Sequence, residues 1–183
     1  MTDEEFAELC SEHPELFFET SPEGDLIVSA PPPTLNGFRN GQLLSQLHAW
    51  AESDGRGIAS GATGAFVLPS GARRTPSAAW TLKSRIRQLD PEILEGIWHL
   101  CPDFVVEIRS ARPRPETVRA KMREWIESGV QLAWLIDPEN RGVEVYRSRS
   151  HGFESKADPE SIAGEGLLEG FVLQLAPVWN PLG

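Results

Sequence analysis

The segment from Pro102 to Pro138 constrains the fold most strongly, because two apolar strand-like runs flank one amphipathic helix there. Along its first run, apolar and polar positions alternate: Phe104, Val106 and Ile108 alternate with Asp103, Val105, Glu107 and Arg109. In a strand every second side chain points to the same face, so Asp103, Glu107 and Arg109 are expected on one face of this strand. A carboxylate on a buried strand needs a metal, a base or hydrogen bonds to offset its desolvation, which favours a functional site. An edge strand with one solvated face is the alternative.

The helix that follows carries a lysine at the border of its apolar stripe. Its apolar positions are predicted to face a sheet: Val118, Met122, Trp125, Ile126 and Val130. Lys121 precedes Met122, so its long side chain can bury its stem and reach toward the end of the neighbouring strand. Glu107 and Lys121 are therefore expected to approach each other.

Length and composition predict one globular domain, residues 1–183. Apolar residues make up 40% of the chain, and no run is long enough for a membrane span. The acidic N-terminus lacks the pattern of a secretory signal, so a cytoplasmic location without membrane contact is expected. Cys10 and Cys101 lack a CxxC or His partner at zinc spacing, which argues against structural zinc and a disulfide framework.

Net charge disfavours non-specific nucleic-acid binding, because the formal charge is −10 and phosphate binding relies on Lys and Arg. The middle of the chain is nevertheless basic. The residues concerned are Arg73, Arg74, Lys83, Arg85, Arg87, Arg109, Arg112, Arg114, Arg119, Lys121 and Arg123. They form either a nucleic-acid face or a set of solvated loops and helix faces.

Periodicity and turn residues predict the remaining elements. Helices are expected at Thr2–Glu12, Leu35–Ser53 and Pro115–Glu127, with a short one after Asp90-Pro91. Strands are expected at Leu16–Glu19, Leu26–Ser29, Ile58–Ser60, Gly64–Leu68, Ala78–Leu82, Asp103–Ser110, Gln131–Ile136 and Val143–Tyr146, with a further edge strand at Phe171–Leu175.

Phosphodiester hydrolysis needs carboxylates that hold a divalent cation and a positive group that orients water and steadies phosphate charge. Glu107 and Lys121 would supply one of each. A buried salt bridge or a lysine that only extends to solvent would place the same two residues together. The serines and histidines show no catalytic or ligand spacing, and Gly61–Gly64 lacks the context of a phosphate loop.

With these residues in view, the chain resembles the putative restriction endonuclease family of the PD-(D/E)XK nuclease superfamily. The resemblance rests on PDFVVEIRS, RAKMREWIESGV and LAWLIDPENRGVEVYR, in that order. It implies that Glu107 is a metal ligand and that Lys121, from the following helix, replaces the usual lysine two residues beyond the glutamate. Arg109 occupies that usual position and is a candidate phosphate contact.

Ser77 departs from the family pattern, because it aligns where the resemblance implies a metal-binding aspartate. A serine hydroxyl in place of the aspartate carboxylate lacks the negative charge and is a weaker oxygen ligand, so Mg²⁺ would depend on Glu107, water or another acid such as Asp103. Three interpretations stay open: an inactive nuclease fold, an active enzyme with migrated ligands, or a substitution peculiar to this chain.

The resulting prediction is an α/β restriction-endonuclease-like core, a central mixed sheet flanked by helices. The site would lie where strands Ala78–Leu82 and Asp103–Arg109 diverge, with Glu107, Lys121 and Ser77 as its residues. The expected function is DNA cleavage with Mg²⁺ or Mn²⁺; the alternative is an inactive binding or assembly module. A homodimer is expected, with the hairpin around Asp137-Pro138 as one contact. Trp80 is a core residue or a base-stacking one.

Overall fold

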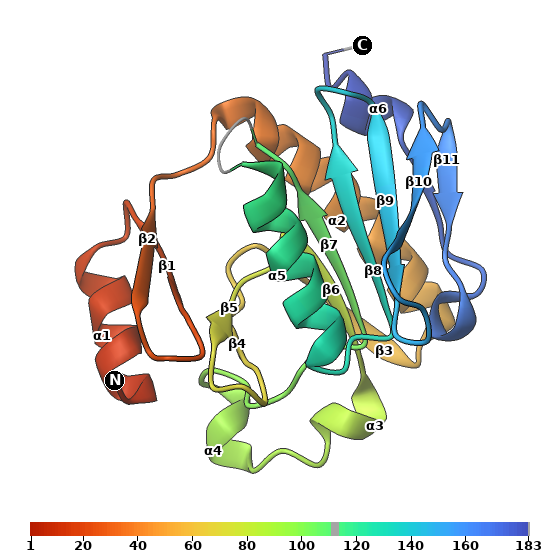
Figure 1. The fold of residues 1–183 in the computed structure, drawn as a ribbon. Helices are drawn as coiled ribbons and strands as arrows, with labels where there is room; N and C mark the ends of the chain where they lie inside the picture. The colour runs from red at the N-terminus through yellow and green to blue at the C-terminus, as the bar shows by residue number, and fades with distance from the viewer. Residues whose placement is uncertain (111–113, 183) are drawn as a thin grey trace.

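In a computed structural model, described for residues 1–110 and 114–182, a six-stranded mixed sheet forms the centre of the molecule (Figure 1). The strand order is β10-β9-β8-β7-β6-β3. The bounds are β3 Gly57–Gly61, β6 Ala78–Leu82, β7 Phe104–Ile108, β8 Leu132–Asp137, β9 Gly142–Arg147 and β10 Phe153–Ala157. Strands β7 and β8 are parallel and their neighbours are antiparallel, which confirms the expected mixed α/β fold.

Helix α5 (Pro115–Glu127) connects the parallel strands β7 and β8, a connection that requires a crossover. It begins and ends where the sequence predicts. Val118, Met122 and Trp125 are buried in one core cluster with Val105 and Leu135, so α5 covers this face of the sheet. The face of β7 that carries Val105 also carries Glu107.

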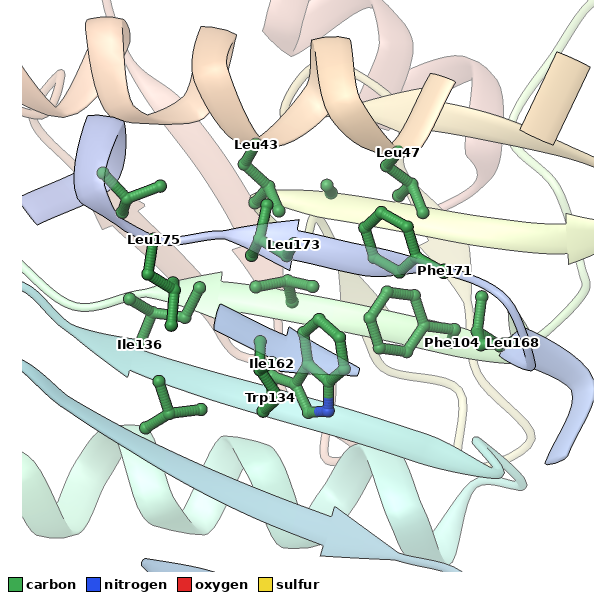
Figure 2. Close-up of a cluster of buried hydrophobic side chains, with 14 of the residues drawn as sticks. Leu43, Leu47, Phe104, Trp134, Ile136, Ile162, Leu168, Phe171, Leu173 and Leu175 are labelled. Carbon is green, nitrogen blue, oxygen red and sulfur yellow. The ribbon is translucent and has the colours of Figure 1, made fainter. Parts of the chain in front are cut away.

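Helix α2 (Thr34–Asp54) covers the opposite face. Leu43 and Leu47 pack against Phe104 and Trp134, and side chains of the C-terminal segment complete this core beside α2, on the same face of the sheet (Figure 2). That segment contains β11 (Ser161–Ala163), a 3-10 helix (Gly166–Leu168), β12 (Val172–Gln174) and α6 (Ala176–Trp179). Trp80 belongs to this core and is fully buried, so it is a core residue and does not stack on bases.

The N-terminal part forms a second, four-stranded sheet beside α5, in the order β2-β1-β5-β4. Its elements are α1 (Asp3–Glu12), β1 (Phe17–Thr20), β2 (Leu26–Ser29), β4 (Phe66–Val67) and β5 (Arg73–Arg74). Thr2 caps α1 through a reciprocal pair of hydrogen bonds with Glu5. This sheet brings Glu19 of β1 and Arg74 of β5 into contact with α5.

The C-terminal third differs most from the prediction. The expected edge strand Phe171–Leu175 is β12, which pairs with β11 in a separate two-stranded sheet. Sequence patterns missed β10 and β11, because β10 is largely exposed and polar and β11 has three residues.

Two short helices, α3 (Lys83–Ile86) and α4 (Pro91–Leu94), lie in the polar segment between β6 and β7. No helix in the described part of the chain is long and apolar enough to cross a membrane.

Candidate active site

Glu107 lies on the central strand β7, on the side covered by α5, and only 8% of its surface is exposed. The indole Nε1 of Trp125, one helical turn beyond Lys121, donates to Glu107 Oε1 at 3.1 Å. The carboxylate is thus held at a fixed position between strand and helix.

Lys121 meets Glu107 as the sequence predicts, with Nζ 2.8 Å from Glu107 Oε1. The Met122 side chain is fully buried beneath α5, which leaves the neighbouring Lys121 at the helix border. Its ammonium also donates to the backbone carbonyl of Thr75 at 3.2 Å. The ammonium therefore lies where β7, α5 and the chain leading into β6 come together.

Glu19, on β1, is the site residue that sequence reasoning missed. Its Oε1 is 2.8 Å from Lys121 Nζ and also accepts the backbone N–H of Thr75 at 2.8 Å. The sequence did contain a weak signal, because Glu19 alternates with the buried Phe18 and Thr20. Nothing in that alternation indicates that β1 lies beside α5.

Charge interactions fix the protonation of Lys121. Burial alone would lower the pKa of Lys121, but Glu107 and Glu19 outweigh burial and raise this pKa to about 12. Burial raises the pKa of Glu107 above its ordinary value, and Lys121 opposes that rise. Lys121 is therefore a permanent cation at neutral pH and cannot act there as a general base.

A second buried cation extends this network toward the N-terminal sheet. Arg74 Nε is 2.6 Å from Glu124 Oε2, and Arg74 Nη1 donates to the Thr20 carbonyl at 3.1 Å. Nη1 also lies 3.6 Å from Glu19 Oε2. Carboxylates and cations consequently alternate from Glu107 through Lys121, Glu19 and Arg74 to Glu124, which ties the N-terminal hairpin to α5.

Ser77 lies beside the site, immediately before β6, but offers a different group from the aspartate expected there. Its Oγ accepts the backbone N–H of Ile108 at 3.0 Å and so completes the hydrogen bonding between β6 and β7. A carboxylate oxygen could accept the same bond. The position is therefore compatible with an aspartate, although this chain lacks one.

Two other predicted residues form ion pairs with residues outside the Lys121 network. Arg109 was expected to contact phosphate, but its guanidinium forms an ion pair with Asp137 at the end of β8. Asp103 precedes β7 at the opposite end from Glu107, where Arg85 pairs with it at 2.7 Å and the Leu82 amide donates to it at 2.9 Å. Asp103 therefore does not replace the missing aspartate, whereas Glu19 supplies a carboxylate at the expected end of β7.

The central basic residues are largely neutralised within the chain. Those that form ion pairs with acidic side chains are Arg73, Arg74, Arg85, Arg109, Arg119 and Lys121. Arg112 lies outside the described residues. These ion pairs weaken the case that the basic segment is, as a whole, a nucleic-acid face.

The donor set around Lys121 fits a hard cation in chemical type. Within residues 1–110 and 114–182, no group of three or more His, Cys, Asp or Glu is arranged to hold a metal ion. Two carboxylates and the Thr75 carbonyl nevertheless converge on one point, which the ammonium occupies. Mg²⁺ commonly uses one or two carboxylates and takes its other ligands from water and substrate phosphate.

Family membership follows from the sequence over nearly the whole chain. Residues 3–176 match the family described as Uma2, putative restriction endonuclease. The chain belongs to this family. The Uma2 assignment agrees with the resemblance carried by the segments around Glu107 and Lys121.

The fold of this Uma2 chain is shared with a solved structure described as a putative nuclease belonging to DUF820, from Anabaena variabilis ATCC 29413. The TM-score is 0.78 at 21% sequence identity, and the alignment covers 98% of this chain and 97% of that one. Similarity at this identity establishes the fold alone. No curated protein matches this Uma2 chain.

Proposed function

We propose that this Uma2 chain hydrolyses phosphodiester bonds in DNA at the site formed by Glu107, Lys121 and Glu19. The observation that supports the proposal is the convergence of two carboxylates, from β7 and β1, on one ammonium carried by α5. Metal-assisted hydrolysis of a phosphodiester uses negative ligands that hold the cation and a fixed positive charge near the phosphate.

Each residue has a role that follows from its environment. Glu107 and Glu19 would hold Mg²⁺ or Mn²⁺, with the Thr75 carbonyl as a further oxygen donor. A bound divalent cation would supply activation of water and neutralisation of phosphate charge. Lys121, protonated because its pKa is about 12, would contact the phosphate or the attacking water through N–H donors. Trp125 positions Glu107 through its indole N–H.

Ser77 lowers the expected affinity of this site for a divalent cation, but the other ligands remain in place. Without a carboxylate at residue 77, the site has less negative charge to hold a divalent cation than the family pattern implies. When a divalent cation binds, the Lys121 ammonium must also move away from at least part of its ion pairs with Glu19 and Glu107. We therefore expect weak cation binding in the absence of DNA, with substrate phosphate completing the ligand set.

The second candidate function is a non-catalytic binding or assembly module. Ser77 favours this alternative, because position 77 has no carboxylate and the Ser77 hydroxyl already accepts a hydrogen bond from the backbone N–H of Ile108. The ammonium also favours it, because Lys121 already compensates both glutamates without a metal. Under this alternative the network is a structural ion cluster.

Cleavage of supercoiled plasmid with Mg²⁺ or Mn²⁺ separates the two candidates. Nicking should occur with the wild-type chain and disappear in Lys121→Met, while circular dichroism verifies the fold. Lys156→Met is the matched control, since Lys156 pairs with exposed Glu154 on β10 and should leave nicking unchanged. Activity that survives Lys121→Met would refute these roles, and a wild-type chain with neither cleavage nor cation binding would favour the non-catalytic module.

A further inference from the structure

Strand β2 is an open edge of the N-terminal sheet. One side of β2 pairs with β1, and within the described ranges 1–110 and 114–182 no strand pairs with its other side. All four residues, Leu26 to Ser29, are exposed. Figure 1 shows the β1–β2 hairpin near α1, away from the central sheet.

This edge is apolar on both faces and carries no charge. Val28 pairs with Phe18 of β1 and Ile27 pairs with Glu19, so the two side chains point to opposite faces. The exposed fractions are 40% for Leu26, 38% for Ile27 and 51% for Val28. Edge strands of monomeric proteins are commonly protected by charges. Edge strand β10 has that protection in Glu154 and Lys156, and β2 lacks it.

The shape of this surface favours a strand as its partner. A helix would cover one face of β2 and leave the open hydrogen-bonding groups of the edge unpaired. Another strand pairs with the edge and covers apolar side chains on both faces at once.

Between two copies of this chain, the charges around β2 favour the antiparallel orientation. Acidic residues Glu23 and Asp25 precede the strand, whereas residues 30–33 after it are uncharged. Antiparallel pairing sets the acidic end of each copy against the uncharged end of the other and keeps the two Asp25 residues about 14 Å apart. Parallel pairing in register would bring them to about 5 Å, where like charges repel.

We propose that two copies of this chain associate through antiparallel pairing of β2, about a two-fold axis that passes beside Ile27 perpendicular to the sheet. Ile27 then lies opposite Ile27 of the partner subunit, and Leu26 lies opposite Val28 of the partner subunit. A two-fold axis requires paired residues to share a face, and this register satisfies that requirement. The contact differs from the turn near Asp137, whose carboxylate Arg109 and Asn140 already engage.

The pairing has a direct consequence for the candidate site. Glu19 lies opposite Ile27 in the β1–β2 register, so the two Glu19 residues and the two Ile27 residues form one row across the joined sheet. Both sites therefore open on the same side of that sheet, with the two Glu19 backbones about 14 Å apart across three strand spacings. Pairing also braces the hairpin that brings Glu19 to Lys121.

Light scattering coupled to size exclusion tests the association. The wild-type chain should have twice its monomer mass of 20.2 kDa, and Val28→Lys should have the monomer mass. Val172→Lys is the matched control, because Val172 is 46% exposed on β12 and should leave the dimer intact. A monomeric wild-type chain, or a Val28→Lys chain that stays dimeric, would overturn the proposal.

Cross-linking tests the register. In a Cys10→Ser background, with Cys101 buried, Ile27→Cys should give a covalent dimer on mild oxidation, because residues directly opposite lie within disulfide reach. Val28→Cys should not, because Val28 faces Leu26 of the partner subunit. Equal cross-linking at both positions would refute the register. Neither experiment measures cleavage, so failure of this proposal and failure of the proposed function are distinguishable.

Discussion

Glu19 and Lys121 link the N-terminal sheet to the helix that covers the central sheet, with Oε1 of Glu19 2.8 Å from Nζ of Lys121. Glu19 is on the N-terminal hairpin and Lys121 is on the helix that covers the central sheet. The contact supplies the site with a carboxylate that the family pattern places elsewhere. It makes the position of the hairpin a condition for the proposed chemistry.

Replacement of Glu19 by Gln should reduce both cation binding and cleavage. The substitution keeps the size of the side chain but removes one of the two negative charges that face the ammonium. We expect Mn²⁺ affinity, measured by calorimetry with bound substrate-like DNA, to fall at least about tenfold, as for loss of a charged oxygen ligand. Glu8→Gln, an exposed acid on α1, is the control for net charge. Unchanged affinity in Glu19→Gln would remove Glu19 from the ligand set.

Replacement of Ser77 by Asp should create or strengthen Mg²⁺-dependent cleavage. Aspartate can still accept the Ile108 amide and adds a hard oxygen donor beside Glu107. Plasmid nicking rates at equal protein concentration measure the effect. Ser77→Asn, of equal size without the charge, should resemble the wild-type chain. An increase in Ser77→Asn as large as in Ser77→Asp would show that charge is not the cause.

Replacement of Arg74 by Met should strongly destabilise the fold. The change leaves Glu124 and Glu19 in a largely buried setting without their shared cation, which costs about 3 kcal/mol. Urea unfolding measures the difference. Arg141→Met should change stability by less than about 0.5 kcal/mol, because Arg141 and its partner Asp158 are both exposed. Similar losses in the two variants would contradict a special role for the Arg74 network.

Asp137 should stabilise the fold at neutral pH and lose this effect in acid. Partial burial alone would raise the pKa of Asp137, but hydrogen bonds from Asn140 and Arg109 outweigh burial and hold this pKa below its ordinary value of 3.8. A lowered pKa contributes stability above 3.8 that is lost as pH falls through the folded-state value. The unfolding free energies of wild type and Asp137→Asn should therefore differ at neutral pH and converge in acid. A constant difference would count against this linkage.

Two glycine substitutions should have opposite effects on stability. A Cβ at Gly57 would lie 2.2 Å from Cε2 of the fully buried Trp80, so Gly57→Ala should cost about 3 kcal/mol. A Cβ at Gly41, an exposed position of α2, meets nothing within 4 Å, so Gly41→Ala should stabilise by about 0.5–1 kcal/mol. Thermal unfolding measures both. A Gly57→Ala chain as stable as wild type would show that Trp80 repacks freely.

The main helices and the central strand were predictable because each carries its own repeating pattern. Alternation placed Glu107 on the same side of β7 as Val105, and the apolar stripe of α5 placed Lys121 at its border. The elements that the sequence did not predict have weak patterns: β10 exposes polar side chains, and β5, β11 and α6 are too short to show a period.

Sequence information was enough to predict the strand and helix around the site and the approach of Glu107 to Lys121, because those features depend on local periodicity and on one short connection; the fold class was predicted together with the family resemblance. Three-dimensional packing was needed to show that Glu19 joins them, that Asp103 faces the other end of β7 and that Trp80 is enclosed in the core. These outcomes depend on how separate segments pack against each other. Local side-chain spacing carries no information about that packing, because burial energy is shared among contacts distant in the chain.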